Sequence, residues 1–188
     1  MKAVIVGCGR VGAGLADELD RAGWQVLIID RLSAAFDRLP SGFGGTALRG
    51  DGTDEDTLRR AGAEGADLFL ALTEGDNRNI MAAQLGIEAL GARQTISKVN
   101  DPVRAEAYAH LGIATLCRTN LMMTAVLVHL GQASPARPGI QAPEKPHEHV
   151  GGAASGAQVG GVTGGVGGVT GGAGGVTGTR GAGTTMEA

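Results

Sequence analysis

The chain begins with a short apolar run that leads into a glycine-rich loop. Residues 2–6 (KAVIV) are typical of a strand that is covered on both faces. Gly7, Gly9 and Gly12 follow with the spacing G-x-G-x-x-G. In such a loop the first glycine permits a tight turn, the second lets a pyrophosphate approach the backbone, and the third packs a helix closely on the strand. We expect the additional Gly14 only to pack closely within that helix.

The residues around the loop make the pattern more specific. Val11, Leu15 and Leu19 repeat every four residues and predict a helix that begins in the loop. The N-terminus of that helix would offer free N–H groups and a partial positive charge to phosphates. Asp30 ends the next apolar run, where a carboxylate accepts hydrogen bonds from ribose hydroxyls and repels a 2′-phosphate. The pattern therefore predicts a site for NAD or ATP rather than NADP.

Short apolar runs alternate with segments of helical periodicity along the chain. The strand candidates after the first are 25–29, 46–50, 67–72, 94–99 and 113–117. Helical spacing appears at Leu58 and Ala61, and again from Ile80 to Leu90. This alternation predicts an α/β fold, a Rossmann-like doubly wound parallel sheet with helices on both faces and the strand order 3-2-1-4-5. Ligands of such sheets bind beyond the carboxyl ends of the strands.

Three basic residues fall near this expected crevice. Arg10 is either a phosphate contact or a surface arginine on the first helical turn. Arg31, directly after Asp30, is expected to be solvated or to lie over the adenine. Lys98, at the end of the fifth strand, is the basic residue expected to face the crevice from that side.

Two further loops end at the same edge of the predicted sheet. After the third strand, we expect Asp51 to meet the adenine amino group and Thr53 to cap the next helix. After the fourth strand, Thr73 and Asn77 are neutral donors placed near the phosphates or the second ribose. Asp76 is either a further contact or a helix N-cap.

The last helix is expected over residues 119–132, and it is apolar nearly all round. It either closes the sheet or pairs with another protomer. Residues 1–132 would form the folded domain, and residues 133–150 a proline-rich linker. Residues 151–188 form a Gly/Val/Thr tail with the repeat VGGVTGG, and their composition cannot offset the entropy of ordering, so we predict that the tail is disordered.

Composition argues against several functional classes. A net charge of −3 without a basic stripe gives no reason to expect nucleic acid binding. No run reaches the ~18 apolar residues of a spanning helix, so we expect no direct insertion into a membrane. Cys8 and Cys117 are far apart and fit buried thiols better than a disulfide. The trio His147-Glu148-His149 falls in the flexible segment, so we expect no metal site.

Several stretches together carry a resemblance to a known family. They are VIVGCGRVG (4–12), Asp30, GDGTDEDTLRRAG (50–62), ADLFLALTEGDNRNIMAAQLG (66–86), SKVNDP (97–102) and YAHLGI (108–113). With these segments the chain resembles the nucleotide-binding half of the RCK or KTN domain of Trk-type potassium-uptake regulators. The similarity covers residues 1–131.

The resemblance implies a cytoplasmic regulatory subunit that forms dimers or rings. Such a subunit would bind NAD(H), or adenine nucleotides such as ATP and ADP, and would gate a membrane potassium transporter by changing shape. The nucleotide contacts that it implies by position are Gly7, Gly9, Arg10, Gly12, Asp30, Asp51, Thr73, Asp76, Asn77 and Lys98.

The chain departs from the family pattern in two places. Relatives carry a proline and an acidic residue after the sixth strand, where residues 116–119 read LCRT, and they continue into a second small domain where this chain enters its glycine-rich tail. One alternative is therefore a truncated accessory subunit that pairs with a full-length relative. Another is an NAD-dependent oxidoreductase, which needs an acid–base group beside the nicotinamide. Tyr108 has no lysine four residues on, and neither His110 nor His129 has a second domain to form a pocket, so sensing is favoured over catalysis.

Overall fold

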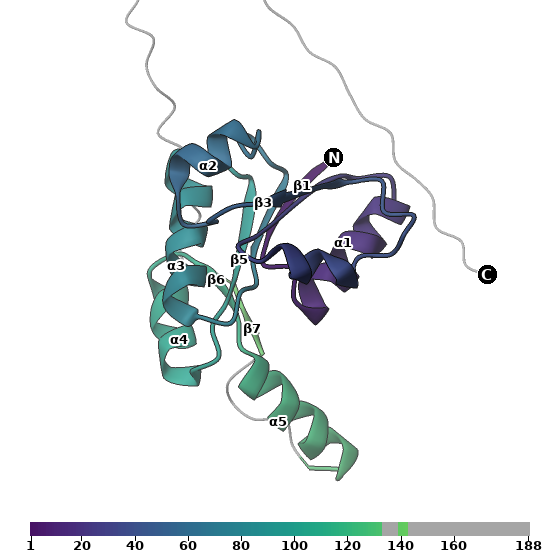
Figure 1. Ribbon diagram of the computed structural model, residues 1–188. Coiled ribbons are helices and arrows are strands. Elements are labelled where there is room, and N and C mark those ends of the chain that lie inside the picture. Colours follow the sequence, from purple (N-terminus) through teal and green to yellow (C-terminus); the bar gives the residue numbers. More distant parts are fainter. Residues whose placement is uncertain (133–138, 143–188) are drawn as a thin grey trace, which may run out of the picture. The chain divides into compact units, whose positions relative to one another are not determined.

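The structure, a computed structural model, describes residues 1–132 and 139–142. These residues contain a seven-stranded sheet with the order β3-β2-β1-β4-β5-β6-β7 (Figure 1). Its strands are β1 (Lys2–Val6), β2 (Gln25–Asp30), β3 (Thr46–Arg49), β4 (Leu68–Ala71), β5 (Gln94–Lys98), β6 (Ala114–Leu116) and β7 (Ile140–Gln141). Strands β1 to β6 pair in parallel, and β7 runs antiparallel to β6. The predicted order 3-2-1-4-5 is confirmed, and two strands extend it at one edge.

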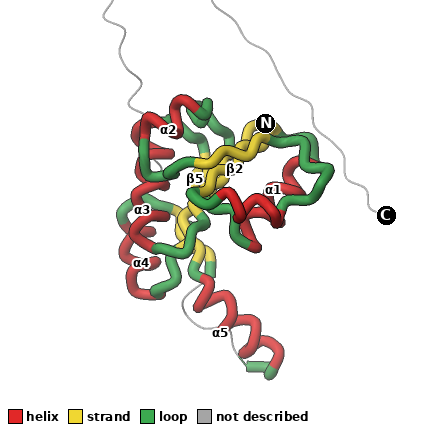
Figure 2. Tube along the Cα trace, in the orientation of Figure 1, coloured by secondary structure: helices red, strands yellow, loops and turns green. Residues whose placement is uncertain are grey.

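A helical segment follows each of the parallel strands (Figure 2). They are α1 (Arg10–Arg21), the 3-10 segment η1 (Ser33–Arg38), α2 (Glu55–Arg60), α3 (Asp76–Gln84), the π-helical turn η2 (Leu85–Ala89), α4 (Pro102–His110) and α5 (Arg118–His129). The sequence analysis missed α4 because the helix buries only the small Ala105 and Ala109, which leave little apolar periodicity. Its start did carry a local signal. Asp101 accepts the N–H of Arg104 at 2.9 Å, and Pro102 fills the first helical position.

Two hydrophobic clusters hold the sheet between its helices. The larger one packs β1 and β4 against α2, α3 and α4, through residues such as Val4, Phe69 and Ile80. The other packs the opposite face of β1 and β2 against α1 and η1, through residues such as Ile5 and Ala16. Helices therefore cover both faces of the central strands, and in Figure 2 α1 lies on one side of the sheet and α2 to α4 lie on the other. This is the doubly wound arrangement that the alternating pattern predicts.

The glycine loop brings the end of β1 and the start of α1 into close approach. Gly7 has φ +107°, and its N–H donates to the carbonyl of Ile29 at 2.7 Å, so the chain turns sharply there. A Cβ atom on Gly12 would lie 2.0 Å from the carbonyl oxygen of Gly7, which leaves no room for a side chain. Both predicted roles are confirmed. The expectation for Gly14 is wrong, because a Cβ atom there would meet nothing within 4 Å.

Helix α5 does not close the sheet. Only Asn120 is buried within it. Leu127 is half-buried, whereas five other apolar residues of the helix are exposed by 39% to 65%, namely Leu121, Met122, Met123, Val126 and Val128. Figure 1 shows the helix extending away from the sheet. Of the two interpretations of residues 119–132, closure of the sheet is therefore wrong, and α5 presents an apolar surface that the described residues leave largely uncovered.

Strand β7 lies within the segment expected to be a linker. The N–H of Cys117 donates to the carbonyl of Gly139 at 2.7 Å, which ties this segment to the start of α5. The sequence analysis did not predict the strand. The other residues of 133–150, the predicted tail at 151–188 and the His147-Glu148-His149 trio lie outside the described residues, so these domain limits stay a prediction. In the described part of the chain, no helix combines the length and the hydropathy needed to cross a bilayer.

The contrast between Gly12 and Gly14 gives a stability test. We expect Gly12→Ala to lower the free energy of unfolding by about 1–3 kcal/mol, because the new methyl group forces α1 away from the end of β1. Gly14→Ala is the matched control in the same helix. It should raise the free energy of unfolding by about 0.5–1 kcal/mol, because alanine favours a helix interior over glycine. Urea unfolding measures both values, and equal effects of the two variants would contradict the close approach at Gly12.

Candidate nucleotide-binding site

A cavity of about 650 Å³ lies beyond the carboxyl ends of β1, β2, β3 and β4. Its volume falls within the range of small-molecule sites. The predicted site residues that line it are Gly7, Gly9, Asp30, Arg31, Asp51, Thr53 and Thr73. The predicted site residues that do not are Arg10, Gly12, Asp76, Asn77 and Lys98. The sheet thus gathers four loops at one edge, where doubly wound sheets bind their ligands.

The glycine loop forms one wall of this cavity. Gly9 is the N-cap of α1, and no side-chain hydrogen bond caps the helix. The first N–H groups of a helix have no intrahelical acceptor, so they remain available to an anion. A Cβ atom on Gly9 would meet nothing within 4 Å, so the space in front of this backbone is open. The wall therefore offers both the donors and the room that a phosphate group requires.

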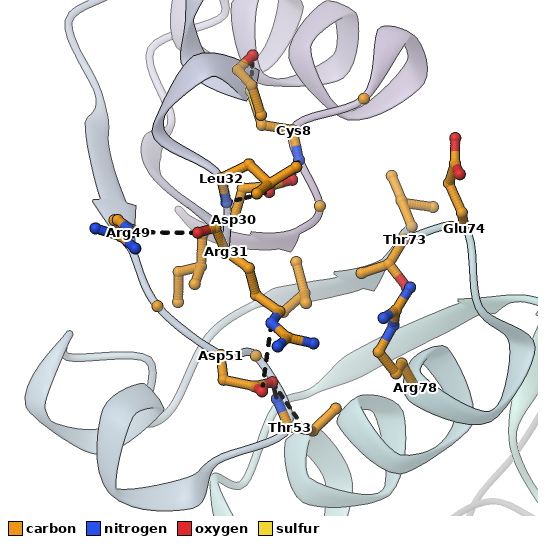
Figure 3. A pocket seen from close by; sticks show the side chains of 18 of the residues that line it. Cys8, Asp30, Arg31, Leu32, Arg49, Asp51, Thr53, Thr73, Glu74 and Arg78 are labelled. Atoms are coloured by element: carbon orange, nitrogen blue, oxygen red, sulfur yellow. Dashed lines mark hydrogen bonds and ion pairs between the residues drawn. The ribbon is translucent and has the colours of Figure 1, made fainter.

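Asp30 stands at the end of β2 with its carboxylate held in place. One oxygen accepts the N–H of Cys8 at 2.7 Å, and the other accepts the N–H of Leu32 at 2.9 Å (Figure 3). Each carboxylate oxygen has a second lone pair, so both can still accept a further hydrogen bond. Asp30 consequently ties the glycine loop to β2 and presents oriented acceptors to the cavity. Hydroxyls of a ribose match this arrangement.

Asp51 and Arg31 approach each other from two different loops across the cavity (Figure 3). One oxygen of Asp51 accepts both the hydroxyl of Thr53, at 2.7 Å, and the N–H of Thr53, at 3.0 Å. The Nε atom of Arg31 lies 3.8 Å from the other oxygen. The hydroxyl bond from Thr53 is the main cause that lowers the pKa of Asp51, and Arg31 adds a smaller contribution. Asp51 is therefore held as a carboxylate.

Thr53 does not cap α2, so that prediction is wrong. The N-cap is Asp54, whose side chain accepts the N–H of Thr57 at 3.1 Å. Similarly, Gly75 is the N-cap of α3, and Asp76 is the first residue inside that helix. The N-cap alternative for Asp76 is therefore wrong as well. In both places the cap lies one position away, and local sequence does not resolve this because Thr, Asp and Gly all favour the cap.

Thr73 is fixed at the edge of the cavity by a residue that the sequence analysis missed. Asn79 is fully buried in α3, and its side-chain oxygen accepts the N–H of Thr73 at 2.7 Å and the hydroxyl of Thr73 at 2.6 Å. Its amide nitrogen donates to the carbonyls of Thr73 and Lys98, both at 2.9 Å. The available signal was an asparagine in the middle of a helix, where this residue is unfavourable unless its side chain has specific partners.

Of the predicted site residues that do not line the cavity, Asp76 and Asn77 have hydrogen-bond partners elsewhere. Asp76 accepts the backbone N–H and the side-chain amide of Asn100, both at 3.0 Å. The side-chain oxygen of Asn77 accepts a hydrogen bond from Arg104. Burial, and then the charge of Arg118, lowers the pKa of Lys98. Arg10 is exposed on the first turn of α1.

Four arginines line the cavity, of which the sequence analysis identified only Arg31. The others are Arg38, Arg49 and Arg78. The Nε atom of Arg49 donates to the carbonyl of Arg31 at 3.2 Å, and the Nε atom of Arg78 lies 3.1 Å from where a Cβ atom of Gly75 would be (Figure 3 labels Arg49 and Arg78). These side chains come from η1, β3 and α3, and nothing in the local sequence marks them as facing one cavity. With Arg31 they place four positive charges on the cavity wall, against the three negative charges of Asp30, Asp51 and Glu74.

Both cysteines are free and buried, as expected. Cys8 lines the cavity, and its thiol donates to the carbonyl of Ala35 at 3.3 Å. Burial, followed by the charge of Asp30, raises the pKa of the Cys8 thiol. The protonated thiol is therefore a structural donor rather than a nucleophile. Within residues 1–132 and 139–142, no group of three or more His, Cys, Asp or Glu side chains is placed to hold a metal ion.

A family model for the TrkA-N domain matches residues 3–119. The chain belongs to this family. A Trk system potassium uptake protein TrkA from Streptomyces coelicolor is 48% identical over 116 residues, which are 62% of this chain and 52% of that protein. The chain thus spans about half the length of this relative. The resemblance to Trk-type regulators found in the sequence is confirmed at the level of the family.

Solved structures share the fold of this TrkA-N domain. The TrkA-N domain of the inner membrane protein ybaL from Escherichia coli superposes with a TM-score of 0.59 at 17% identity, over 69% of this chain and 95% of that one. A GsuK channel bound to NAD superposes with a TM-score of 0.54 at 19% identity, over 67% of this chain and 23% of that one. At these identities the likeness establishes the Rossmann-like fold.

The bond between Thr53 and Asp51 predicts a measurable titration shift. We expect Thr53→Val to raise the pKa of Asp51 toward its ordinary value of about 3.9, because the hydroxyl of Thr53 is the largest cause of its depression. Since the folded pKa lies below the unfolded one, Asp51 stabilises the fold above the unfolded pKa, and this contribution is lost as the pH falls through the folded pKa. Carbon-detected NMR titration measures the shift. Arg31→Gln should produce a smaller rise, and the reverse ranking would contradict the assignment.

Proposed function

We propose that this chain is a nucleotide-binding regulatory subunit of a Trk- or Ktr-type potassium uptake system. The observation that carries the proposal is a cavity in which the uncapped start of α1 lies beside a carboxylate that two N–H groups hold in place. Helix N–H groups suit a pyrophosphate, and the oriented carboxylate suits ribose hydroxyls. The similarity to a Trk system potassium uptake protein supports the assignment to potassium uptake.

The proposed ligand is NAD(H), with ATP or ADP as alternatives. Asp30 disfavours a 2′-phosphate, and Asp51, which also lines the cavity, is proposed to accept a hydrogen bond from an adenine amino group. The proposed contacts on the cavity wall are Gly7, Gly9, Asp30, Arg31, Asp51, Thr53 and Thr73. Arg10 is proposed to reach a phosphate from the exposed first turn of α1. Gly12 contributes through its close approach to Gly7.

The chemistry of the cavity wall favours binding over catalysis. Its ionisable acids are Asp30, Asp51, Glu74 and Cys8. Asp30 and Cys8 are engaged in hydrogen bonds with neighbouring segments, and Asp51 accepts hydrogen bonds from Thr53 within its own loop. No histidine, lysine or tyrosine is among the described residues that line it. A nicotinamide-dependent oxidoreductase is the alternative, since the fold alone does not separate the two classes. Turnover of NAD(H) that depends on an added substrate would favour the enzyme.

The proposed subunit acts as an oligomer, through α5, on a membrane potassium transporter. Parallel sheets are normally covered on both faces, yet Ile96, Ala114 and Leu116 in β5 and β6 are only half-buried. The exposed apolar surface of α5 lies next to these strands along the chain. A second copy, or a full-length relative for which this chain is an accessory subunit, would cover both surfaces. In this proposal the protein is cytoplasmic and reaches the membrane through its transporter.

Calorimetry with NAD, NADH, ATP and ADP tests the nucleotide proposal. We expect Asp30→Ala to weaken NAD binding by about 1–3 kcal/mol, because ribose hydroxyls lose a charged acceptor. Asp56→Ala is the matched control, since this exposed aspartate on α2 does not line the cavity. It should leave the affinity unchanged. If none of the four nucleotides binds the wild-type chain, the proposed function is wrong.

Analytical ultracentrifugation tests the role of α5. We expect Val126→Glu to raise the dissociation constant of the oligomer by about tenfold or more, because it places a charge on an exposed apolar surface that becomes buried. Val103→Glu on α4 introduces the same charge at a residue of similar exposure, 64% against 58%, and should leave the assembly intact. A monomeric wild-type chain at high concentration would rule out self-association through α5.

A further inference from the structure

A set of polar contacts, buried at the Asn79 end and exposed at the Thr119 end, connects the cavity to the start of α5. It begins at Thr73 on the cavity wall and passes through Asn79 and Asp76, both on α3. It ends at Asn100, after β5, and at Thr119, in the first turn of α5. These five residues are called the polar bridge below. They join two features with separate proposed roles, namely the nucleotide cavity and the uncovered helix.

Asn79 makes the first half of the bridge rigid. Its side chain makes four hydrogen bonds, three to Thr73 and one to the carbonyl of Lys98 at the end of β5. This uses the hydrogen-bonding capacity of a carboxamide fully, and the residue is 0% exposed. A buried amide that loses its partners is costly, so Thr73, α3 and the end of β5 must move together or not at all.

Asp76 and Asn100 make the second half. The same carboxylate oxygen of Asp76 accepts the backbone and side-chain N–H groups of Asn100, while the other accepts the N–H of Asp101 at 3.3 Å. The carbonyl of Asn100 then accepts the hydroxyl of Thr119 at 2.8 Å and the thiol of Cys117 at 3.6 Å. The loop after β5 is thus held by the first turn of α3 on one side and by the start of α5 on the other.

We propose that Asn79 and Asp76 are positioning residues that transmit occupancy of the cavity to the first turn of α5. The inference rests on the proposed function and adds a physical route for the regulation of that site. A ligand that contacts Thr73 favours one position of α3, and the polar bridge imposes that position on Asn100 and Thr119. Because α5 is held mainly at its first turn, a small displacement there reorients the whole exposed helix.

Hydrogen exchange of the 188-residue chain, with and without saturating NAD, tests the route. In the wild type we expect NAD to change exchange of the backbone amides of residues 117–123 by about fivefold or more, the lower end of typical allosteric coupling. Asp76→Ala should abolish this change, since Asn100 loses its acceptor. Asp76→Asn should retain it, because the amide oxygen can still accept both N–H groups of Asn100.

Variants at the far end of the bridge separate transmission from folding. Thr119→Val should remove the response of residues 117–123, whereas Thr119→Ser, which keeps the hydroxyl, should restore it. Thr115→Val is the matched control. It also deletes a hydroxyl-to-carbonyl bond, from Thr115 to Ala105, but lies outside the bridge and should respond as the wild type does. By thermodynamic reciprocity, Thr119→Val should also change the calorimetric affinity for NAD, while Thr115→Val should not.

The possible failures are distinguishable. In one failure, NAD binds, and it changes the exchange of residues 117–123 equally in the wild type, Asp76→Ala and Thr119→Val. The polar bridge then does not transmit occupancy of the cavity. The inference is wrong in that case, but nucleotide binding stands. The inference is also wrong, with nucleotide binding intact, if NAD binds the wild type without changing the exchange of these residues. If neither NAD, NADH, ATP nor ADP binds, the proposed function fails, and the inference fails with it.

Discussion

The site depends on the close backbone approach at Gly7. Strand β1 lies between β2 and β4, and the chain that leaves it must turn in the narrow space between their ends. Gly7 donates its N–H to Ile29 on one side, and on the other a Cβ atom would lie only 2.9 Å from the backbone nitrogen of Thr73. A side chain there would push the loops after β2 and β4 apart. The absence of one lets the ends of β1, β2, β3 and β4 and the start of α1 enclose a single cavity.

The cavity keeps its shape because polar side chains tie neighbouring loops to each other. Asp30 binds the N–H of Cys8, and Asp51 binds Thr53 and approaches Arg31. The cavity wall is therefore largely preformed, and a ligand that binds there does not have to order these loops. Such preorganisation suits a sensor, in which the binding free energy is available to shift the rest of the molecule.

Much of the fold could be predicted because its signals are local. Apolar strands, the glycine spacing and Asp30 each report on a few neighbouring residues, and the structure places these elements as expected. The errors in the predicted helices and contacts also arise from reliance on local signals. Helix α4 was missed because small alanines form its buried face, and the predicted cap of α2 was shifted by one residue. Asn77 was chosen as a contact near Thr73, whereas Asn79, two positions later on the helix, faces Thr73.

By itself, the sequence determined the doubly wound sheet, the edge at which a ligand would bind, and the chemical character of the glycine loop with its distant carboxylate. Hydrophobic periodicity and glycine stereochemistry suffice for these features because they act within one element and its loop. Only the tertiary structure decided which side chains share the cavity, since Arg38, Arg49 and Arg78 come from separate elements. It also decided that α5 projects from the sheet, because a helix that is apolar all round does not specify what will cover it.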